Sequence, residues 1–278
     1  MPGLILEGGT FRPIFSSGLM DALLEHNIMF DYVIGVSAGI SDGVSYVSRQ
    51  KGRNLEIIMK YRRDKRYIGA GNYLKCRSLF GLDFVYGEIP DTLVPFDWET
   101  YLQYAGKVVV GVTNARTGEA EYLDGMRMDR KFTMLRATCA LPMVFPPILL
   151  NGQEYYDGGL RDPIPIRKAL ADGMEKNLIV LTRQEGYQKE LSRENKLAAR
   201  LLGKKYPKLV EPLLTRHTAY NETVKFCEEL AESGKAVLVR PKDPLDSFEK
   251  DLEKIKAAYR EGYELAEERL EEIKALFS

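Results

Sequence analysis

A serine stands between two glycines in Gly35-Val36-Ser37-Ala38-Gly39, which matches the pattern Gly-x-Ser-x-Gly. A serine hydroxyl is a weak nucleophile, so an enzyme that uses it must expose it beside a base. A sharp turn between a strand and a helix does this, and glycines leave room for its tight backbone. Here an apolar run precedes the serine and a helical pattern follows it. The pattern therefore predicts that Ser37 is a nucleophile and that Gly35 and Gly39 shape the turn around it.

A glycine-rich turn follows the first apolar run, in Glu7-Gly8-Gly9-Thr10-Phe11-Arg12. Successive backbone N–H groups in such a turn can converge on an anion. In acyl transfer the anion is the tetrahedral oxyanion, and each preorganised donor is worth roughly 3–4 kcal/mol. We expect Gly8, Gly9 and Thr10 to form an oxyanion hole, and Arg12 to hold the turn or to meet a lipid phosphate. The turn lacks the glycine spacings of nucleotide-binding loops.

The chain offers few bases for this serine, because it contains only two histidines. His26 ends the first predicted helix, where we expect it to cap that helix or to face solvent. His217 lies in a polar stretch with a helical pattern. A serine hydrolase without an obligatory histidine needs a carboxylate beside its nucleophile. Asp157 precedes Gly158-Gly159, which predicts a loop freed by glycines, so we expect Asp157 to be the base and the two glycines to support it.

The spacing of apolar residues predicts the elements that carry these groups. Apolar runs predict buried strands at residues 4–6, 32–36, 107–112, 178–181 and 236–239. A turn at 115–119 leads to one more extended segment at 120–123. Helical spacing predicts helices at about 16–25, after Ser37, at 129–138 and over most of 189–231. Strands that alternate with helices favour a mostly parallel sheet that is covered on both faces.

The last part of the chain, about 247–277, has the pattern of one long amphipathic helix. Its apolar stripe includes Leu252, Ile255, Leu270 and Ile273. A helix that lies on a membrane prefers a basic polar face, whereas this polar face has charges of both signs. We therefore expect the helix to pack on the rest of the domain.

The composition excludes several classes of protein. The 278 residues contain 40 Lys and Arg and 40 Asp and Glu, and this balance argues against nucleic acid as a partner. Three widely spaced cysteines give neither a disulfide framework nor a zinc-binding pattern, which favours a reducing cytoplasm. The first residues do not resemble a secretory signal, and no run reaches the roughly 18 apolar residues that span a membrane. We expect a cytoplasmic protein that meets any lipid substrate peripherally, from outside the bilayer.

Together the three motifs resemble those of the patatin-like phospholipase family. The family pattern is an acidic residue with Gly-Gly-Gly-x-Arg-Gly, then Gly-x-Ser-x-Gly, then Asp-Gly-Gly or Asp-Gly-Ala. The corresponding segments occur here in the same order, at residues 7–13, 35–39 and 157–159. The stretch 137–147 looks like the family's segment before the aspartate, and Arg216-His217 with Tyr220-Asn221 resembles a downstream element of bacterial members. The resemblance covers roughly residues 4–240.

This resemblance implies a three-layer α/β/α patatin-like fold, as a single domain over residues 1–278 with a core at about 4–240. It implies a phospholipase A or esterase activity on a lipid or other ester. Ser37 would attack the ester carbonyl, Asp157 would take the serine proton, and the glycine-rich turn would hold the oxyanion. Water would then release the fatty acid from the acyl-enzyme. No metal or cofactor is implied.

Two residues depart from the family pattern: Thr10 replaces the third glycine and Pro13 replaces the last one. Thr10 keeps its N–H but is β-branched, which disfavours positive φ, and Pro13 has no N–H. We therefore expect a reshaped oxyanion turn or the loss of one donor. Two alternatives stay open. The chain could be a lipid- or acyl-binding or regulatory protein that has lost catalysis, or an α/β-hydrolase with a triad of Ser37, Asp157 and His217.

Overall fold

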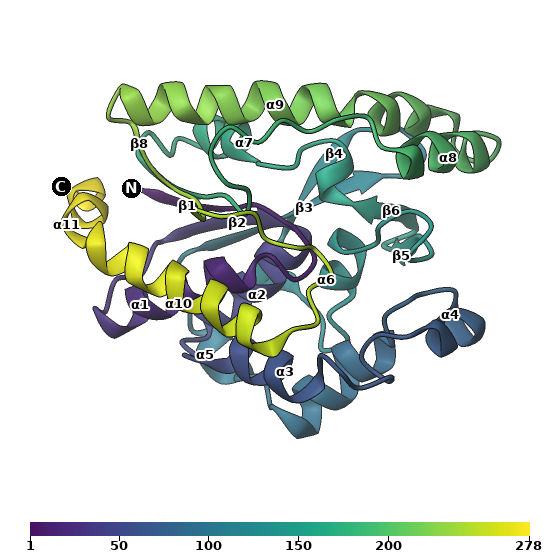
Figure 1. Ribbon diagram of the computed structural model, residues 1–278, viewed down its shortest axis with the longest axis horizontal. Coiled ribbons are helices and arrows are strands. Elements are labelled where there is room, and N and C mark those ends of the chain that lie inside the picture. The colour runs from purple at the N-terminus through teal and green to yellow at the C-terminus, as the bar shows by residue number, and fades with distance from the viewer.

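An eight-stranded sheet forms the middle layer of the computed structural model, which describes residues 1–278 (Figure 1). Its strands are Gly3–Leu6 (β1), Tyr32–Val36 (β2), Lys107–Asn114 (β3), Ala120–Asp124 (β4), Ile148–Leu150 (β5), Gln153–Asp157 (β6), Asn177–Val180 (β7) and Ala236–Val239 (β8). The strand order is β5-β6-β3-β2-β1-β7-β8, and β4 also pairs with β3. Strands β3, β2, β1, β7 and β8 are parallel, whereas β4, β5 and β6 join the sheet antiparallel.

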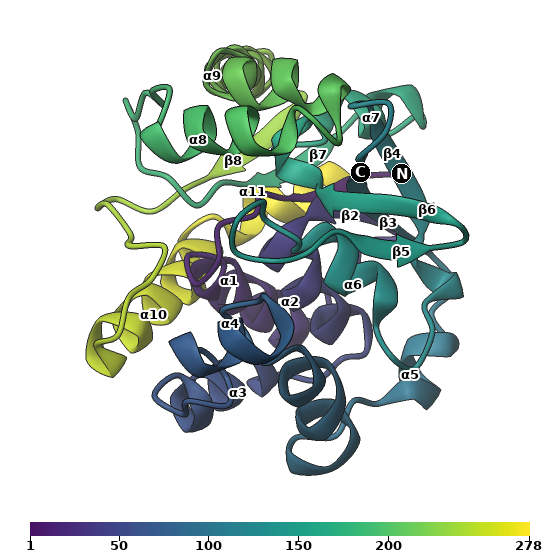
Figure 2. The same ribbon diagram turned by 90° about the vertical axis from the view of Figure 1, so that its right-hand side faces the viewer.

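Helices cover both faces of the sheet, as Figures 1 and 2 show from two directions. One layer contains Ile166–Ala171 (α7), Arg193–Leu202 (α8) and Val210–Glu232 (α9). The opposite layer contains Ile14–Glu25 (α1), Ser37–Val47 (α2), Thr133–Thr138 (α6) and Leu252–Glu268 (α10). The prediction of a three-layer α/β/α fold with a mostly parallel central sheet is confirmed.

Two apolar cores fill the spaces between the layers, because successive side chains of a strand point to opposite faces of the sheet. Leu4 and Leu6 of β1 belong to the larger core, under α1 and α2. Ile5, which lies between them in the sequence, belongs to the second core with residues of α7 and α9, among them Ile166 and Tyr220. All three β1 side chains have no exposed surface. The continuous apolar runs of the parallel strands therefore reflect burial on both faces.

The predicted strands are confirmed to within one or two residues, and the predicted turn at 115–119 joins β3 to β4. Strands β5 and β6 were not predicted, because β5 is only three residues long and β6 begins with polar residues. The helix predicted at 129–138 begins only at Thr133. Asp129 stands before it, and its carboxylate accepts a hydrogen bond of 2.8 Å from the Thr133 N–H.

The C-terminal segment differs from the single helix predicted over 247–277. Helix α10 begins at Leu252, where the Asp251 carboxylate accepts a bond from the Glu253 N–H, and it ends at Glu268. A short helix, Leu270–Lys274 (α11), follows after a break at Arg269, whose guanidinium donates a 2.5 Å bond to the Leu238 carbonyl. Within this segment α10 lies against α1 (Figure 1).

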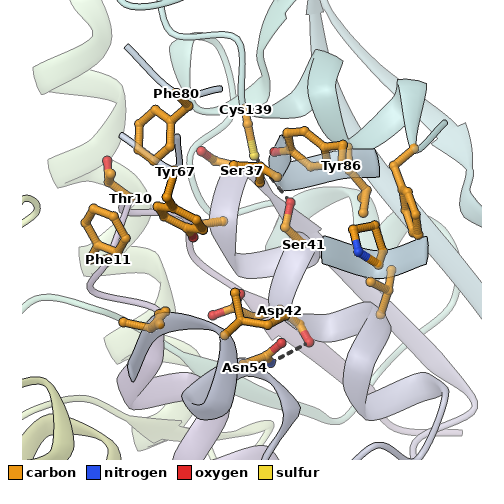
Figure 3. A pocket seen from close by; sticks show the side chains of 18 of the residues that line it. Thr10, Phe11, Ser37, Ser41, Asp42, Asn54, Tyr67, Phe80, Tyr86 and Cys139 are labelled. Carbon is orange, nitrogen blue, oxygen red and sulfur yellow. Dashed lines mark hydrogen bonds between the residues drawn. The ribbon is translucent and has the colours of Figure 1, made fainter. Parts of the chain in front are cut away.

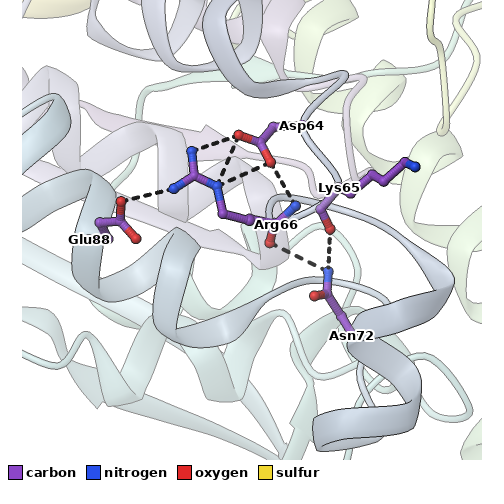
Figure 4. A network of polar contacts seen from close by, with 5 residues as sticks. All are labelled: Asp64, Lys65, Arg66, Asn72 and Glu88. Carbon is purple, nitrogen blue, oxygen red and sulfur yellow. Dashed lines mark hydrogen bonds and ion pairs between the residues drawn. The ribbon is translucent and has the colours of Figure 1, made fainter.

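Residues 48–106 follow α2 in the chain and precede β3; they extend the helical layer that contains α1, α2 and α10, in the lower half of Figure 2. Their helices are Arg53–Tyr61 (α3), Ala70–Cys76 (α4), the π-helical segment Phe84–Leu93 and Trp98–Leu102 (α5). A polar network ties two parts of this layer together (Figure 4). Arg66 reaches Glu88 at 3.1 Å and also pairs with Asp64. No helix of the structure is long and apolar enough to cross a membrane.

Candidate active site

Ser37 occupies the sharp turn at which β2 ends and α2 begins. Its φ is 54°, in the left-handed region that non-glycine residues seldom adopt and that often marks functional turns. Gly39, two residues further, lies so close to the Glu7 carbonyl oxygen that a Cβ atom there would overlap with it. Gly35 lies next to the turn, paired with Leu6 of β1. The observed backbone is therefore the strand-to-helix turn that the Gly-x-Ser-x-Gly pattern predicts.

Strand β3 brings Asp157 to this turn. β2 runs along β3 as far as the pair Val36–Gly111, and β6 arrives antiparallel with Asp157 opposite Val112. One edge of this part of β3 is already paired with β4. Strand β6 therefore pairs with the other edge, directly after the last residue of β3 that pairs with β2. Ser37 and Asp157, which are 120 positions apart in the sequence, therefore lie at neighbouring places beside β3. Asp157 lies at the end of a strand, so the prediction that it lies on a loop was wrong, although the 3₁₀ turn Gly158–Leu160 follows directly.

The Ser37 hydroxyl donates a hydrogen bond of 2.6 Å to the Oδ2 of Asp157. The other carboxylate oxygen, Oδ1, accepts a 2.8 Å bond from the Gly159 N–H, which fixes the orientation of the group. Only 1% of Asp157 is exposed, and this burial raises the pKa of its carboxyl group, while the positive charge of Arg216 opposes the rise. A carboxylate with a raised pKa is a stronger base than a solvated one.

The predicted oxyanion turn keeps its donors. The backbone N–H groups of Gly8, Gly9 and Thr10 donate to no acceptor within the protein. Thr10 has a φ of 59°, so it adopts the left-handed backbone despite its branched side chain. Pro13 stands at the start of α1, where a missing N–H leaves no helical bond unmade. Neither departure from the family pattern therefore removes a donor from residues 8–10.

Arg12 holds the glycine-rich turn, which was one of its two predicted roles. Its side chain is buried, and its Nε donates a 3.2 Å bond to the Thr182 hydroxyl. The same guanidinium bonds to the Ser247 hydroxyl and lies 3.9 Å from the carboxylate of Glu7. Glu7 in turn accepts a 2.6 Å bond from the Thr182 N–H. These contacts join the turn after β1 to the loop after β7.

Neither histidine takes part in this arrangement. His26 follows α1 and lies 2.7 Å from the carboxylate of Glu267, so its predicted position at the helix end is confirmed. His217 lines neither of the two cavities that contain Ser37. In a triad the imidazole lies between the serine and the aspartate. Here Ser37 and Asp157 bond directly to each other, which does not fit a triad with His217.

Two cavities meet at Ser37. The first has a volume of about 140 Å³, and 15 of its 22 lining residues are hydrophobic. Figure 3 shows Ser37 and Cys139 at one end of it, Phe80 and Tyr67 beside them, and Asp42 at the opposite end. The second has a volume of about 360 Å³, and only 7 of its 24 lining residues are hydrophobic. Ser37, Thr10 and Leu141 line both cavities, so the nucleophile lies at their junction.

The sequence analysis missed several residues of this site. Arg183, Lys189 and Arg216 line the polar cavity. Thr138 contacts the backbone of Ser37. A signal existed only for Thr138 and Arg216, which lie in the two segments that resemble family elements. Much of the wall of the apolar cavity comes from residues 48–106, for which no motif was recognised.

Comparison with known proteins agrees with the class that the fold and the serine turn define. The family model described as "Patatin-like phospholipase" matches residues 4–170, and the chain belongs to this family. A second model, a domain of unknown function (DUF6363), matches residues 206–278. Strand β8 within this second region pairs with β7, and α10 packs on α1. We therefore propose that residues 1–278 form one domain.

Individual relatives are distant. The chain is 24% identical over 277 residues to the uncharacterized protein YjjU of Escherichia coli, which covers 94% of this chain and 74% of that protein. It is 26% identical over 295 residues to lysophospholipase nte1 of Aspergillus terreus, which covers 98% of this chain but only 18% of the fungal protein. Among solved structures, VipD from Legionella pneumophila matches with a TM-score of 0.47 and 14% identity, over 97% of this chain and 66% of that one.

Proposed function

We propose that the protein is a serine lipid acyl hydrolase that cleaves a carboxylic ester through an acyl-enzyme on Ser37. The observation that carries this proposal is the 2.6 Å hydrogen bond between the Ser37 hydroxyl and the buried Asp157 carboxylate. Three N–H groups without acceptors lie in the neighbouring turn, at residues 8–10. A nucleophile, a base and preorganised donors are the parts that acyl transfer requires.

The reaction would proceed in two halves. Ser37 attacks the ester carbonyl while Asp157 takes the serine proton, and the N–H groups of Gly8, Gly9 and Thr10 stabilise the oxyanion. The intermediate collapses when the alcohol leaves with the proton from Asp157, and the acyl group stays on Ser37. Water then attacks the acyl-enzyme, Asp157 takes a proton from that water, and the fatty acid leaves as the proton returns to Ser37.

The two cavities support an amphipathic substrate. The apolar cavity suits an acyl chain, and the polar cavity on the other side of Ser37 suits the alcohol part. Only one of the two cavities has a mostly hydrophobic wall, which favours one acyl chain per substrate. The name lysophospholipase, which belongs to the fungal relatives, describes a substrate with one acyl chain and agrees with this assignment. We therefore favour monoacyl lipids as the substrate class.

We further propose that the protein works in the cytoplasm and meets its lipid at a membrane surface. Helix α4 carries apolar side chains in solvent, with Leu74 89% exposed and Tyr73 40% exposed. Lys75 and Arg77 lie beside them in the sequence, and cations favour contact with anionic lipid head groups. The alternative of a catalytically disabled binding protein rested on Thr10 and Pro13, and the unbonded N–H groups of the turn argue against it.

Hydrolysis of p-nitrophenyl esters with acyl chains of increasing length tests the proposal. Wild type should turn over, while Ser37→Ala and Asp157→Asn should fall by on the order of 10³-fold or more, because each removes a group that acts in both halves of the reaction. Ser233→Ala and Asp243→Asn make the same chemical changes at exposed positions and should behave like wild type. A folded wild type with no activity above that of Ser37→Ala on any ester would contradict the proposal.

A further inference from the structure

Three cations line the polar cavity without a carboxylate partner: Arg183 and Lys189 from the loop after β7, and Arg216 from α9. Arg183 lies over the ring of Tyr187 at 4.4 Å, and its Nε is buried without any hydrogen-bond partner. The ammonium of Lys189 lies over the ring of Tyr220 at 4.3 Å. Unpaired cations in a partly buried cavity are costly unless an anion joins them.

The carboxylates of the same cavity are engaged elsewhere. Glu7 accepts from Thr182 and lies beside Arg12. Asp157 accepts from Ser37 and Gly159. Glu194 is exposed in the first turn of α8. Arg183, Lys189 and Arg216 therefore form no ion pair within the protein. Burial, together with the charges of Arg216, Arg12 and Arg183, lowers the pKa of Lys189 to about 7, although Glu7 opposes this shift.

The three cations also lie on the side of Ser37 that we assign to the alcohol part of the substrate. Arg216 donates a 2.5 Å bond to the carbonyl of Gly159, whose N–H holds the Asp157 carboxylate. Arg216 is thus connected to the proposed base through a single residue, Gly159. An anion bound at this cluster would therefore lie across Ser37 from the apolar cavity, on the side of the departing alcohol.

We propose that Arg183, Lys189 and Arg216 bind a phosphate group on the alcohol part of the substrate, so that the protein selects monoacyl lipids with an anionic head. This inference rests on the proposed acyl hydrolase activity for its location relative to the ester. Guanidinium groups bind phosphate oxygens through paired N–H donors, and Lys adds a point charge. Arg183 and Lys189 already cover the rings of Tyr187 and Tyr220, so these two rings are not open to a quaternary ammonium group.

Calorimetric binding to the full-length Ser37→Ala chain tests this site without turnover. The probes are a monoacylglycerol phosphate, the neutral monoacylglycerol with the same acyl chain, and the corresponding lysophosphatidylcholine. We expect the phosphate monoester to bind at least about tenfold more tightly than either other lipid. Arg183→Met and Lys189→Met should each remove most of this preference. Lys196→Met, the same change on an exposed part of α8, should keep it.

Equal affinity for the three lipids, or an undiminished preference in both cation variants, would overturn the proposal. Titration with inorganic phosphate separates a head-group site from a free-anion site. Phosphate alone should compete only weakly, and binding as tight as that of the lipid phosphate would overturn the head-group assignment. Circular dichroism checks that each variant is folded.

Reaction of Ser37 with a fluorophosphonate in the wild type keeps the two proposals apart. Reaction at Ser37 without any phosphate preference would overturn the anion site and leave the hydrolase proposal standing. A phosphate preference without any reaction at Ser37 would overturn the hydrolase proposal and leave the anion site standing.

Discussion

The hydroxyl of Thr138 accepts a hydrogen bond of 2.7 Å from the backbone N–H of Ser37 and donates one of 2.5 Å to the carbonyl of Gly111. Thr138 is the last residue of α6 and has no exposed surface. Its hydroxyl thus connects α6, β3 and the turn that carries the nucleophile. Because Ser37 has a left-handed backbone, this bond stabilises a conformation that costs energy by itself.

Thr138→Val should lower both stability and activity. The substitution leaves the Ser37 N–H and the Gly111 carbonyl without their buried partner, which costs about 1–3 kcal/mol of unfolding free energy. We expect kcat to fall by roughly tenfold or more, because small displacements of a nucleophile are costly. Denaturant unfolding and ester hydrolysis measure the two effects. Thr138→Ser keeps the hydroxyl and should recover most of the activity; a Val variant as active as the Ser variant would exclude this positioning role.

His217→Ala should retain ester hydrolysis within about twofold of wild type, because Ser37 bonds directly to Asp157 and His217 lines neither cavity. A catalytic triad would instead lose on the order of 10³-fold or more in kcat. Steady-state kinetics on one p-nitrophenyl ester distinguishes the Ser37–Asp157 dyad from a triad with His217. A loss in His217→Ala as large as that in Asp157→Asn would restore the triad.

Phe80→Ala should shift the acyl preference towards longer or bulkier chains. Phe80 lines the apolar cavity and stacks on Phe145 with ring centroids 5.5 Å apart, so its removal enlarges the space beside Ser37. The ratio of kcat/KM between medium-chain and short-chain esters measures the shift. Tyr73→Ala, on the exposed face of α4, is the matched control and should keep the wild-type ratio. An unchanged ratio in Phe80→Ala would mean that the acyl chain binds elsewhere.

Asp42 should make stability depend on pH. Burial raises its pKa from 3.8 to about 7, although the Ser17 hydroxyl, which donates to it at 2.9 Å, and the charge of Arg53 both oppose the rise. Between these pH values the folded chain holds a proton that the unfolded chain releases, so the free energy of unfolding decreases as pH rises. Asp42→Asn should remove this pH dependence, so its free energy of unfolding should increase relative to that of wild type between pH 4 and about pH 7.

Urea unfolding at several pH values between these limits tests the prediction for Asp42. Asp243→Asn, at an exposed position, should follow the wild-type curve. A constant difference between wild type and Asp42→Asn over this range would mean that Asp42 does not titrate there.

The parts of the fold that depend on local patterns were predictable. Strands β1, β2, β7 and β8 are buried on both faces, so a short run of apolar residues identifies each of them. Strand β6 escaped this rule, because its burial depends on pairing with β3 and not on its own composition. The break of the C-terminal helix at Arg269 likewise depends on a contact with Leu238, which no local pattern contains.

The same division applies to the candidate site. Ser37, the turn at residues 8–10 and Asp157 stand in motifs, and the structure brings these segments together. The cations of the polar cavity were not predictable in this way. Lys189 and Arg216 lie 27 positions apart in segments rich in charge, where lysine and arginine usually face solvent. Only the packing of α9 against the loop after β7 places them in one cavity.

Covalent labelling of Ser37 by a fluorophosphonate tests the central claim most directly, because the probe reacts only with a serine that a neighbouring base activates. Mass spectrometry identifies the labelled residue, and the labelling rate is compared between wild type, Asp157→Asn and Asp243→Asn. We predict rapid modification of Ser37 in wild type and Asp243→Asn, and a rate at least about 100-fold lower in Asp157→Asn. Equal rates in wild type and Asp157→Asn, or label on any other serine, would contradict the Ser37–Asp157 dyad.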